Sequence, residues 1–508
     1  MKKAQNRSMA WIVILSLFLM AGPLAARTAQ AATQDFGDLD VLEAVEKELI
    51  ADPGVLLNNI DVTVAQGIVT LSGTVNNILA KDRATRVAET VKGVRSVVNR
   101  IEVDPVVVRS DMELARDVED ALLMNAATES YEIRVSSADG MVTLRGTVDS
   151  WKERRLAGIV AKGVRGVTGL ENQIEVIIPE ERTDPEIREE VQKALRWDEL
   201  VDHVLIDVRV NEGHVTLSGV VGSAAEKRKA LIDAHVTGVK SVDGSQLEVK
   251  YWARNEDLRK DKYVVKSDQA VHDAVEDALM YDPRVSGLDV TTRVEDGIVT
   301  LRGNVDDLME KQAAEHDALN TVGVLSVKNR LRVRPDEPVQ DWEVEQRANA
   351  ALTRDPYLEP YEITVEVTGG TASLYGEVDS YFEKTQAEDV VSSVEGIWVV
   401  DNKIRVDYHR DYLTFDPYVD DRYLSDYDWY RPEPVYPKMD DAKIEDEIKG
   451  ELWWSPFVDS DDVEVTVNNG RVTLTGEVDS WSEYSAAGRN AYEGGATWVD
   501  NDLEVVMQ

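Results

Sequence analysis

Residues Glu295-Asp-Gly-Ile-Val-Thr-Leu-Arg-Gly-Asn-Val305 form a pattern that occurs six times along the chain. Each copy has two glycines six positions apart, and the first lies at a tight turn, where a positive φ is cheap only for glycine. The residues after it alternate between apolar and polar, as expected for a strand with one buried face. The stretch is therefore predicted to be a β-hairpin, and the chain a repeat protein. The glycine pairs are Gly67/Gly73, Gly140/Gly146, Gly213/Gly219, Gly297/Gly303, Gly370/Gly376 and Gly470/Gly476.

An amphipathic helix is predicted before each hairpin. A leucine stands eighteen residues before the first glycine in every copy, with apolar residues four and eight positions earlier. In the first copy these are Val41, Val45 and Leu49, which would share one face of a helix. The residue three positions after the leucine is Asp, Asn or Ser, and in four of the six copies it precedes proline, which ends the helix.

A second helix and a last strand complete the repeating unit. Ser or Asp followed three residues later by Glu predicts a helix-starting capping box in five copies, and Asn77 with Ala80 leaves half a box in the first. A glycine follows this helix as a C-cap, and an Asn-x-Ile/Leu-x-Val pattern then predicts a strand in five copies. The fold class is therefore α+β: a tandem array of six αββαβ modules, each with two helices on one face of a three-stranded sheet. The order of the strands stays open. The second helix has alanine at one position in all copies, namely Ala84, Ala157, Ala230, Ala314, Ala387 and Ala487.

The modules and the segments between them have clear boundaries. Residues 251–266 form a charged linker that is compatible with a helix, and residues 408–439 form a Tyr/Asp/Pro-rich linker that fits neither helix nor strand. The other linkers are short, which predicts that modules one to three, and four with five, lie near each other. The predicted modules are residues 39–104, 110–177, 183–250, 267–334, 340–407 and 440–508.

The hairpin glycines, the strand valines and the glycine before the last strand together resemble the BON domain family. The resemblance covers nearly all of the chain after residue 31. It implies a periplasmic or envelope setting, a link to osmotic-shock protection, and attachment to phospholipid membranes or envelope proteins. It implies no catalytic residues.

The N-terminal 31 residues are predicted to be a secretory signal peptide. Lys2, Lys3 and Arg7 precede an apolar run, and Ala29-Gln30-Ala31 is a small-x-small cleavage site. The protein is therefore expected to be exported to the periplasm after cleavage following Ala31. The alternative is an uncleaved anchor helix, although the apolar run is shorter than the roughly 20 residues that a span needs.

Charge and cysteine content exclude several classes of function. The formal net charge of the 508-residue chain is −40, which argues against nucleic acid as a partner and against adsorption of the whole chain to anionic lipid. The chain has no cysteine, so disulfides, thiol catalysis and cysteine-based metal sites are excluded. The acidity is better explained as a means of keeping an exported chain soluble.

No catalytic residue, cofactor site or metal site is predicted, and no small-molecule substrate is identified. Three of the six histidines, His203, His214 and His235, lie in module three, but they lack metal-ligand spacing, so a zinc site there is the weaker alternative. The acidic run from Asp416 to Asp428 lacks the glycine-bearing loop of an EF-hand.

Aromatic residues that differ between copies are the candidate contact residues. They are Trp197, Tyr281, Trp453 and Trp454 at the end of the first helix, and Tyr427, Trp429 and Tyr430 in the 408–439 linker. Tyr and Trp give a large contact area at modest entropic cost, so this linker is predicted to dock either on modules five and six or on a partner. Trp151, Tyr381 and Trp481, just after the second helix begins, are predicted to lie at the edge of the core.

The sequence as a whole favours an exported, non-enzymatic binding protein that contacts envelope phospholipid or envelope proteins. The alternative is a periplasmic chaperone-like protein that shields unfolded chains. An enzyme is disfavoured, because the features that the six copies share are explained by folding.

Overall fold

The structure is a computed structural model that describes residues 36–506, except 56–59, 107, 126, 129–131, 178–181, 255–261, 263, 286–289, 335–338, 359–360, 407–439 and 497. The predicted signal peptide and the 408–439 linker lie outside the described residues, as do Tyr427, Trp429 and Tyr430. Residues 36–506 belong to one compact unit. The charged linker is described only in part, and Tyr251–Arg254 form a short 3₁₀ helix, η3.

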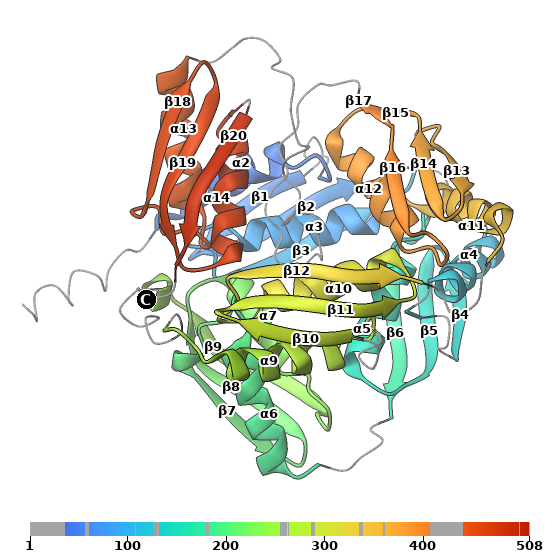
Figure 1. Cartoon of the computed structure of the whole chain (residues 1–508), viewed down its shortest axis with the longest axis horizontal. Helices are drawn as coiled ribbons and strands as arrows, with labels where there is room; N and C mark the ends of the chain where they lie inside the picture. The colour runs from blue at the N-terminus through green and yellow to red at the C-terminus, as the bar shows by residue number, and fades with distance from the viewer. Residues whose placement is uncertain are drawn as a thin grey trace, which may run out of the picture. The chain divides into compact units, whose positions relative to one another are not determined.

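Six copies of the αββαβ unit are present, as predicted, and each contains two α-helices (Figure 1). The first helices are α2 (Asp38–Ala51), α4 (Asp111–Met124), α6 (Asp184–Trp197), α9 (Asp268–Met280), α11 (Asp341–Arg354) and α13 (Asp441–Trp454). The second helices are α3 (Ile78–Glu89), α5 (Trp151–Lys162), α7 (Ala224–Asp233), α10 (Leu308–Leu319), α12 (Tyr381–Ser392) and α14 (Trp481–Glu493).

Three strands form the sheet of each module. The hairpins are β1 (Ile60–Ala65) with β2 (Ile68–Val75), β4 (Ile133–Ala138) with β5 (Met141–Val148), β7 (Ile206–Asn211) with β8 (His214–Val221), β10 (Val290–Glu295) with β11 (Ile298–Val305), β13 (Thr364–Thr368) with β14 (Thr371–Tyr375), and β18 (Val463–Asn468) with β19 (Arg471–Val478). The last strands are β3 (Ser96–Val103), β6 (Gly169–Val176), β9 (Ser241–Val249), β12 (Ser326–Val333), β16 (Val399–Asn402) and β20 (Trp498–Val505).

The structure settles the order of the strands. The second strand of each module is central, antiparallel to the first strand and parallel to the last. The second helix is therefore the crossover between two parallel strands. In module five the central and last strands continue as a second short parallel pair, β15 (Glu377–Val378) and β17 (Arg405–Val406).

Each module has its own apolar core between its helices and one face of its sheet. In module one, Leu49 from α2, Leu71 from β2 and Ile101 from β3 are all at most 1% exposed. The repeated alanine of the second helix is 0% exposed in all six modules. A small side chain at this position lets the helix lie close on the sheet, which explains the alanine.

The hairpin turn is held by an aspartate that the sequence analysis did not identify. Asp296 and Gly297 have φ of 51° and 72°, the two positive values of a type I′ turn. Both of their amides donate hydrogen bonds to the carboxylate of Asp268, the first residue of α9, at 3.1 Å. An aspartate stands 29 residues before the turn glycine in every module and accepts from the turn in each: Asp38, Asp111, Asp184, Asp268, Asp341 and Asp441.

The start of the second helix differs in one detail from a capping box. Ser150 accepts from the amide of Glu153 at 3.1 Å, but the Glu153 carboxylate accepts from Asp149, one residue before the cap, at 2.8 Å. The same displaced bond occurs in modules three, four and six. In module one the half box is confirmed, with Asn77 accepting from the amide of Ala80 at 2.7 Å.

Candidate functional site

Trp453 and Trp454, predicted as an exposed contact pair, lie where module six meets module one. The ring of Phe36 lies 5.8 Å from the ring of Trp453 and 5.7 Å from that of Trp454. The amide of Lys92 donates to the carbonyl of Trp454 at 3.2 Å, and the Lys92 ammonium lies 5.6 Å from the Trp453 ring. Trp453 keeps 39% of its surface exposed. That this pair also contacts an external partner remains a proposal.

The same backbone contact joins two other pairs of modules. Arg165 of module two donates its amide to the carbonyl of Arg354 of module five at 2.7 Å, and Val322 of module four donates to Trp197 of module three at 3.0 Å. In each case the end of one first helix meets the loop after another module's second helix. The pairs are one with six, two with five, and three with four, so Trp197 also lies at a module contact. Tyr281, the C-cap of α9, is half-buried.

The residue that begins the second helix also reaches another module. The indole NH of Trp151 donates to the carbonyl of Val239 in module three, and that of Trp481 to Leu325 in module four, each at 2.6 Å. Ile78 of module one packs into the core of module two, and Ala224 of module three into that of module one. Trp151 and Trp481 were predicted to lie at the edge of the core, and the structure places them between modules. Nothing is described of the Tyr381 side chain.

The contact between modules one and six also encloses three glutamates. Glu48 of α2 and Glu451 and Glu493 of module six have carboxylate oxygens within 4.8 Å of one another. Glu451 also forms an ion pair with Lys47. Burial and the neighbouring carboxylate of Glu451 raise the pKa of Glu493 to about 8, and burial raises the pKa of Glu48 well above its usual range. The arrangement favours the protonated forms of Glu48 and Glu493.

Replacing Glu493 with glutamine is expected to stabilise the chain at alkaline pH. The folded state holds the Glu493 proton up to pH about 8, whereas the unfolded state loses it near the ordinary value of 4.5. Stability therefore falls as pH rises through this window. The variant should gain at least about 1 kcal/mol over the parent at pH 8.5 and almost nothing at pH 4.5.

Thermal melting of the two chains between these pH values measures the effect. Glu46→Gln, on the exposed face of the same α2 helix, is the control and should show no such trend. A gain for Glu493→Gln that does not depend on pH would contradict the assignment.

Two of the three histidines of module three have hydrogen-bond partners of their own. His214 Nδ1 lies 2.8 Å from Ser241 Oγ, and His235 Nδ1 lies 2.8 Å from the carbonyl of Leu231 beside the Trp151 ring. Burial lowers the pKa of His203. Among the described residues, these histidines do not belong to a group whose ligand atoms lie close enough together to hold a metal ion.

Module four carries a cluster of cations on the outer face of its sheet. We call Arg293, Arg302, Lys328, Arg330 and Arg332 the cationic face. The register places Arg302 beside Arg330 and sets both Arg293 and Lys328 beside Thr300. All five side chains are exposed. In Figure 1 the strands of module four, in yellow and olive, lie in front of their helices.

The cationic face is largely unneutralised. Arg293 forms an ion pair with Glu295, whereas Arg302, Lys328, Arg330 and Arg332 form none with a described residue. Four other modules have glutamate at the position of Arg332: Glu102, Glu175, Glu248 and Glu504. The sequence analysis missed this face, although the signal was present as basic residues at every second position from Lys328 to Arg334.

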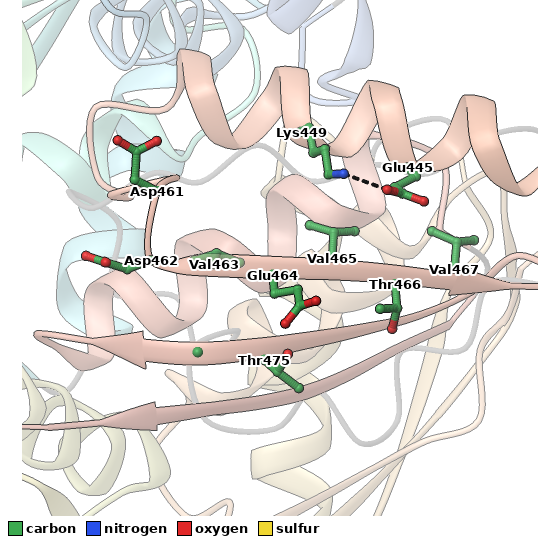
Figure 2. Close-up of a pocket in the computed structure, with 11 residues that line it drawn as sticks. Glu445, Lys449, Asp461, Asp462, Val463, Glu464, Val465, Thr466, Val467 and Thr475 are labelled. Atoms are coloured by element: carbon green, nitrogen blue, oxygen red, sulfur yellow. Dashed lines mark hydrogen bonds and ion pairs between the residues drawn. The ribbon is translucent and has the colours of Figure 1, made fainter.

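A groove lies in module six between α13 and the edge strand β18 (Figure 2). It encloses about 640 Å³. The helix contributes Glu445 and Lys449, whose side chains form an ion pair. The strand contributes its backbone and Glu464, and the turn before it contributes Asp461 and Asp462. Carboxylates therefore predominate along the groove.

Within residues 36–506, the part of the chain that is described, no helix has both the length and the apolar character to cross a bilayer.

Comparison with known proteins agrees with the repeat structure. The BON domain family matches residues 37–105, 110–177, 183–251, 267–335, 340–408 and 440–507. Osmotically-inducible protein Y of Escherichia coli (strain K12) is 30% identical over 143 residues, which are 27% of this chain and 71% of that protein. An uncharacterized protein in the gshII 5' region of Anaplasma centrale is 30% identical over 135 residues, 26% of this chain and 88% of that protein. Among solved structures, CdsD, a structural protein of the type III secretion system of Chlamydia trachomatis, is 15% identical in sequence, with a TM-score of 0.12. The match covers 41% of this chain and 91% of the CdsD chain.

Proposed function

The chain belongs to the BON domain family, and we therefore propose that it is an exported, non-enzymatic protein that binds the anionic phospholipid surface of the envelope through the cationic face of module four. The observation that carries this proposal is a set of five exposed cations, four of which form no ion pair with a described residue, in a chain with a net charge of −40. Like charges on adjacent strands, such as Arg302 and Arg330, repel one another, and an anionic partner would relieve that repulsion.

The acidity of the chain does not prevent such local binding. The Debye length is about 8 Å at physiological salt, so carboxylates on other modules are largely screened from a lipid headgroup at the cationic face. Arginine also forms bidentate hydrogen bonds with phosphate, which lysine does not, and four of the five cations are arginine.

The setting that we propose is the periplasm, with the signal peptide removed after Ala31. One relative is named as osmotically inducible, which supports a role in osmotic or envelope stress.

The polar residues that recur in all modules have structural roles. The repeated aspartates, for example, accept hydrogen bonds from the amides of the hairpin turns. This supports a binding role over catalysis. Trp453, still partly exposed, and the aromatic residues of the 408–439 linker remain secondary candidates for contact with lipid or an envelope protein.

Removing three charges from the cationic face is expected to abolish most of the lipid binding. The variant is Arg302→Gln/Lys328→Gln/Arg330→Gln in the chain from Ala32. Each basic residue near an anionic surface contributes roughly fivefold to binding, so three together should weaken it about 100-fold. Co-sedimentation with phosphatidylcholine vesicles that contain or lack phosphatidylglycerol measures this, at low and physiological salt.

A matched control removes the same charge from the sheet faces of modules one and two. Arg100, Arg134 and Arg145 are also exposed, and the triple glutamine variant at these positions should bind almost as the parent does. Equal loss in both variants would mean that only net charge matters. Binding that ignores phosphatidylglycerol would contradict the proposal.

A further inference from the structure

The groove of module six exposes the backbone of an edge strand. β18 pairs with β19 on one side, and α13 lies along the other. An unpaired strand edge is a ready template for another strand, and proteins usually protect such edges. The accessible backbone at this edge therefore requires an explanation.

Module five shows how the same edge is closed elsewhere in the chain. Asn349 of α11 accepts from the amide of Val365 at 3.4 Å and donates to its carbonyl at 3.5 Å. Glu345 accepts from the amide of Val367 at 3.2 Å. Two side chains of the first helix thus form hydrogen bonds with the backbone groups of strand β13 that point away from β14.

Module six lacks this protection, because one of the two helix residues differs. The equivalent helix positions, one hundred residues later, are Glu445 and Lys449. Lysine has no acceptor for an amide and cannot imitate the asparagine, and its ammonium instead forms an ion pair with Glu445. Val465 and Val467 pair with β19 in the same register as Val365 and Val367 with β14. Their outward amides and carbonyls consequently face the groove.

We infer that this groove binds an extended peptide segment with basic side chains, which adds to β18 as a further strand. Main-chain hydrogen bonds to β18 would supply affinity. The charge of the groove selects the occupant, because Asp461, Asp462 and Glu464 line it, and its one cation is already paired. This surface is separate from the cationic face and does not depend on the lipid proposal.

The test uses the full mature chain and a short, end-blocked peptide of alternating lysine and valine. Fluorescence anisotropy should detect binding of this peptide. Two other peptides should fail: one with glutamate in place of lysine, and one with N-methylated backbone amides along one edge. Equal binding of the N-methylated peptide would overturn strand addition.

The decisive variant is Lys449→Asn, which copies the edge cap of module five. It should weaken peptide binding about tenfold or more, because the asparagine side chain occupies backbone groups that the peptide needs. Lys449 is more than half exposed, so the substitution should leave the melting temperature unchanged or higher. Lys443→Asn removes the same charge from an exposed position of the same helix and should bind as the parent does. Unchanged binding by Lys449→Asn, or an equal loss in Lys443→Asn, would overturn the inference.

Discussion

Replacing Gly476 with alanine is expected to destabilise module six by about 3 kcal/mol or more. Gly476 lies in the central strand β19 with a φ of +136°, which L side chains rarely adopt. An added Cβ would lie 2.0 Å from the carbonyl oxygen of Asp462, the residue just before the neighbouring strand β18. Neither backbone segment can move away easily, because the hairpin pairing fixes their separation.

Urea unfolding of the full chain, followed by tryptophan fluorescence, measures this loss. Gly450→Ala is the control, because a Cβ at Gly450 would meet nothing within 4 Å. Gly450 lies inside α13, where alanine should stabilise the helix by roughly 0.5–1 kcal/mol. If Gly476→Ala unfolds as the parent does, the explanation of the second glycine of the repeat is wrong.

Replacing Arg83 with methionine is expected to destabilise module one by about 3–5 kcal/mol. Asp52 is 1% exposed and Arg83 6%. The Arg83 Nε lies 2.7 and 2.9 Å from the two carboxylate oxygens of Asp52. Methionine keeps much of the volume but leaves a buried carboxylate without its counter-charge. The guanidinium also lies 5.1 Å from the ring of Phe382 in module five, so this contact between modules would weaken as well.

Module five contains the natural control for this experiment. Gln386 and Asp355 occupy the positions of Arg83 and Asp52, and the Gln386 amide donates to the Asp355 carboxylate at 2.7 Å. Arg83→Gln should therefore lose less than half as much stability as Arg83→Met in urea unfolding. Equal losses of stability would show that the packing of the Arg83 side chain, and not its hydrogen bonds with Asp52, determines the effect.

The unit and its core could be predicted from the sequence because their determinants are local and occur six times. The turn glycines, the alternation of Val299 and Leu301, and the helical spacing before them each depend on neighbours within a few residues. The hairpin aspartate could have been found in the same way, because its spacing from the turn glycine never changes. Its role could not, since that role is a contact between the start of a helix and a turn 28 or 29 residues later.

The roles of the candidate contact residues depended on distances that no local pattern encodes. Trp454 meets Lys92, 362 residues away in sequence, and Trp151 meets Val239 instead of the edge of its own core. Aromatic residues suit a core, a partner or a neighbouring module equally well, so composition alone could not choose among them.

By itself, the sequence determined the six αββαβ modules and the residues that form their hairpins and cores. Only the tertiary structure decided which modules meet, that the edge of β18 is open where that of β13 is closed, and which of the described cations remain unpaired. The physical reason is that backbone conformation and amphipathic burial act over a few residues, whereas ion pairing and edge protection depend on what comes near in space. Lys449 and Asn349 show this, because they stand at equivalent positions and only their contacts reveal that one strand edge is exposed and the other closed.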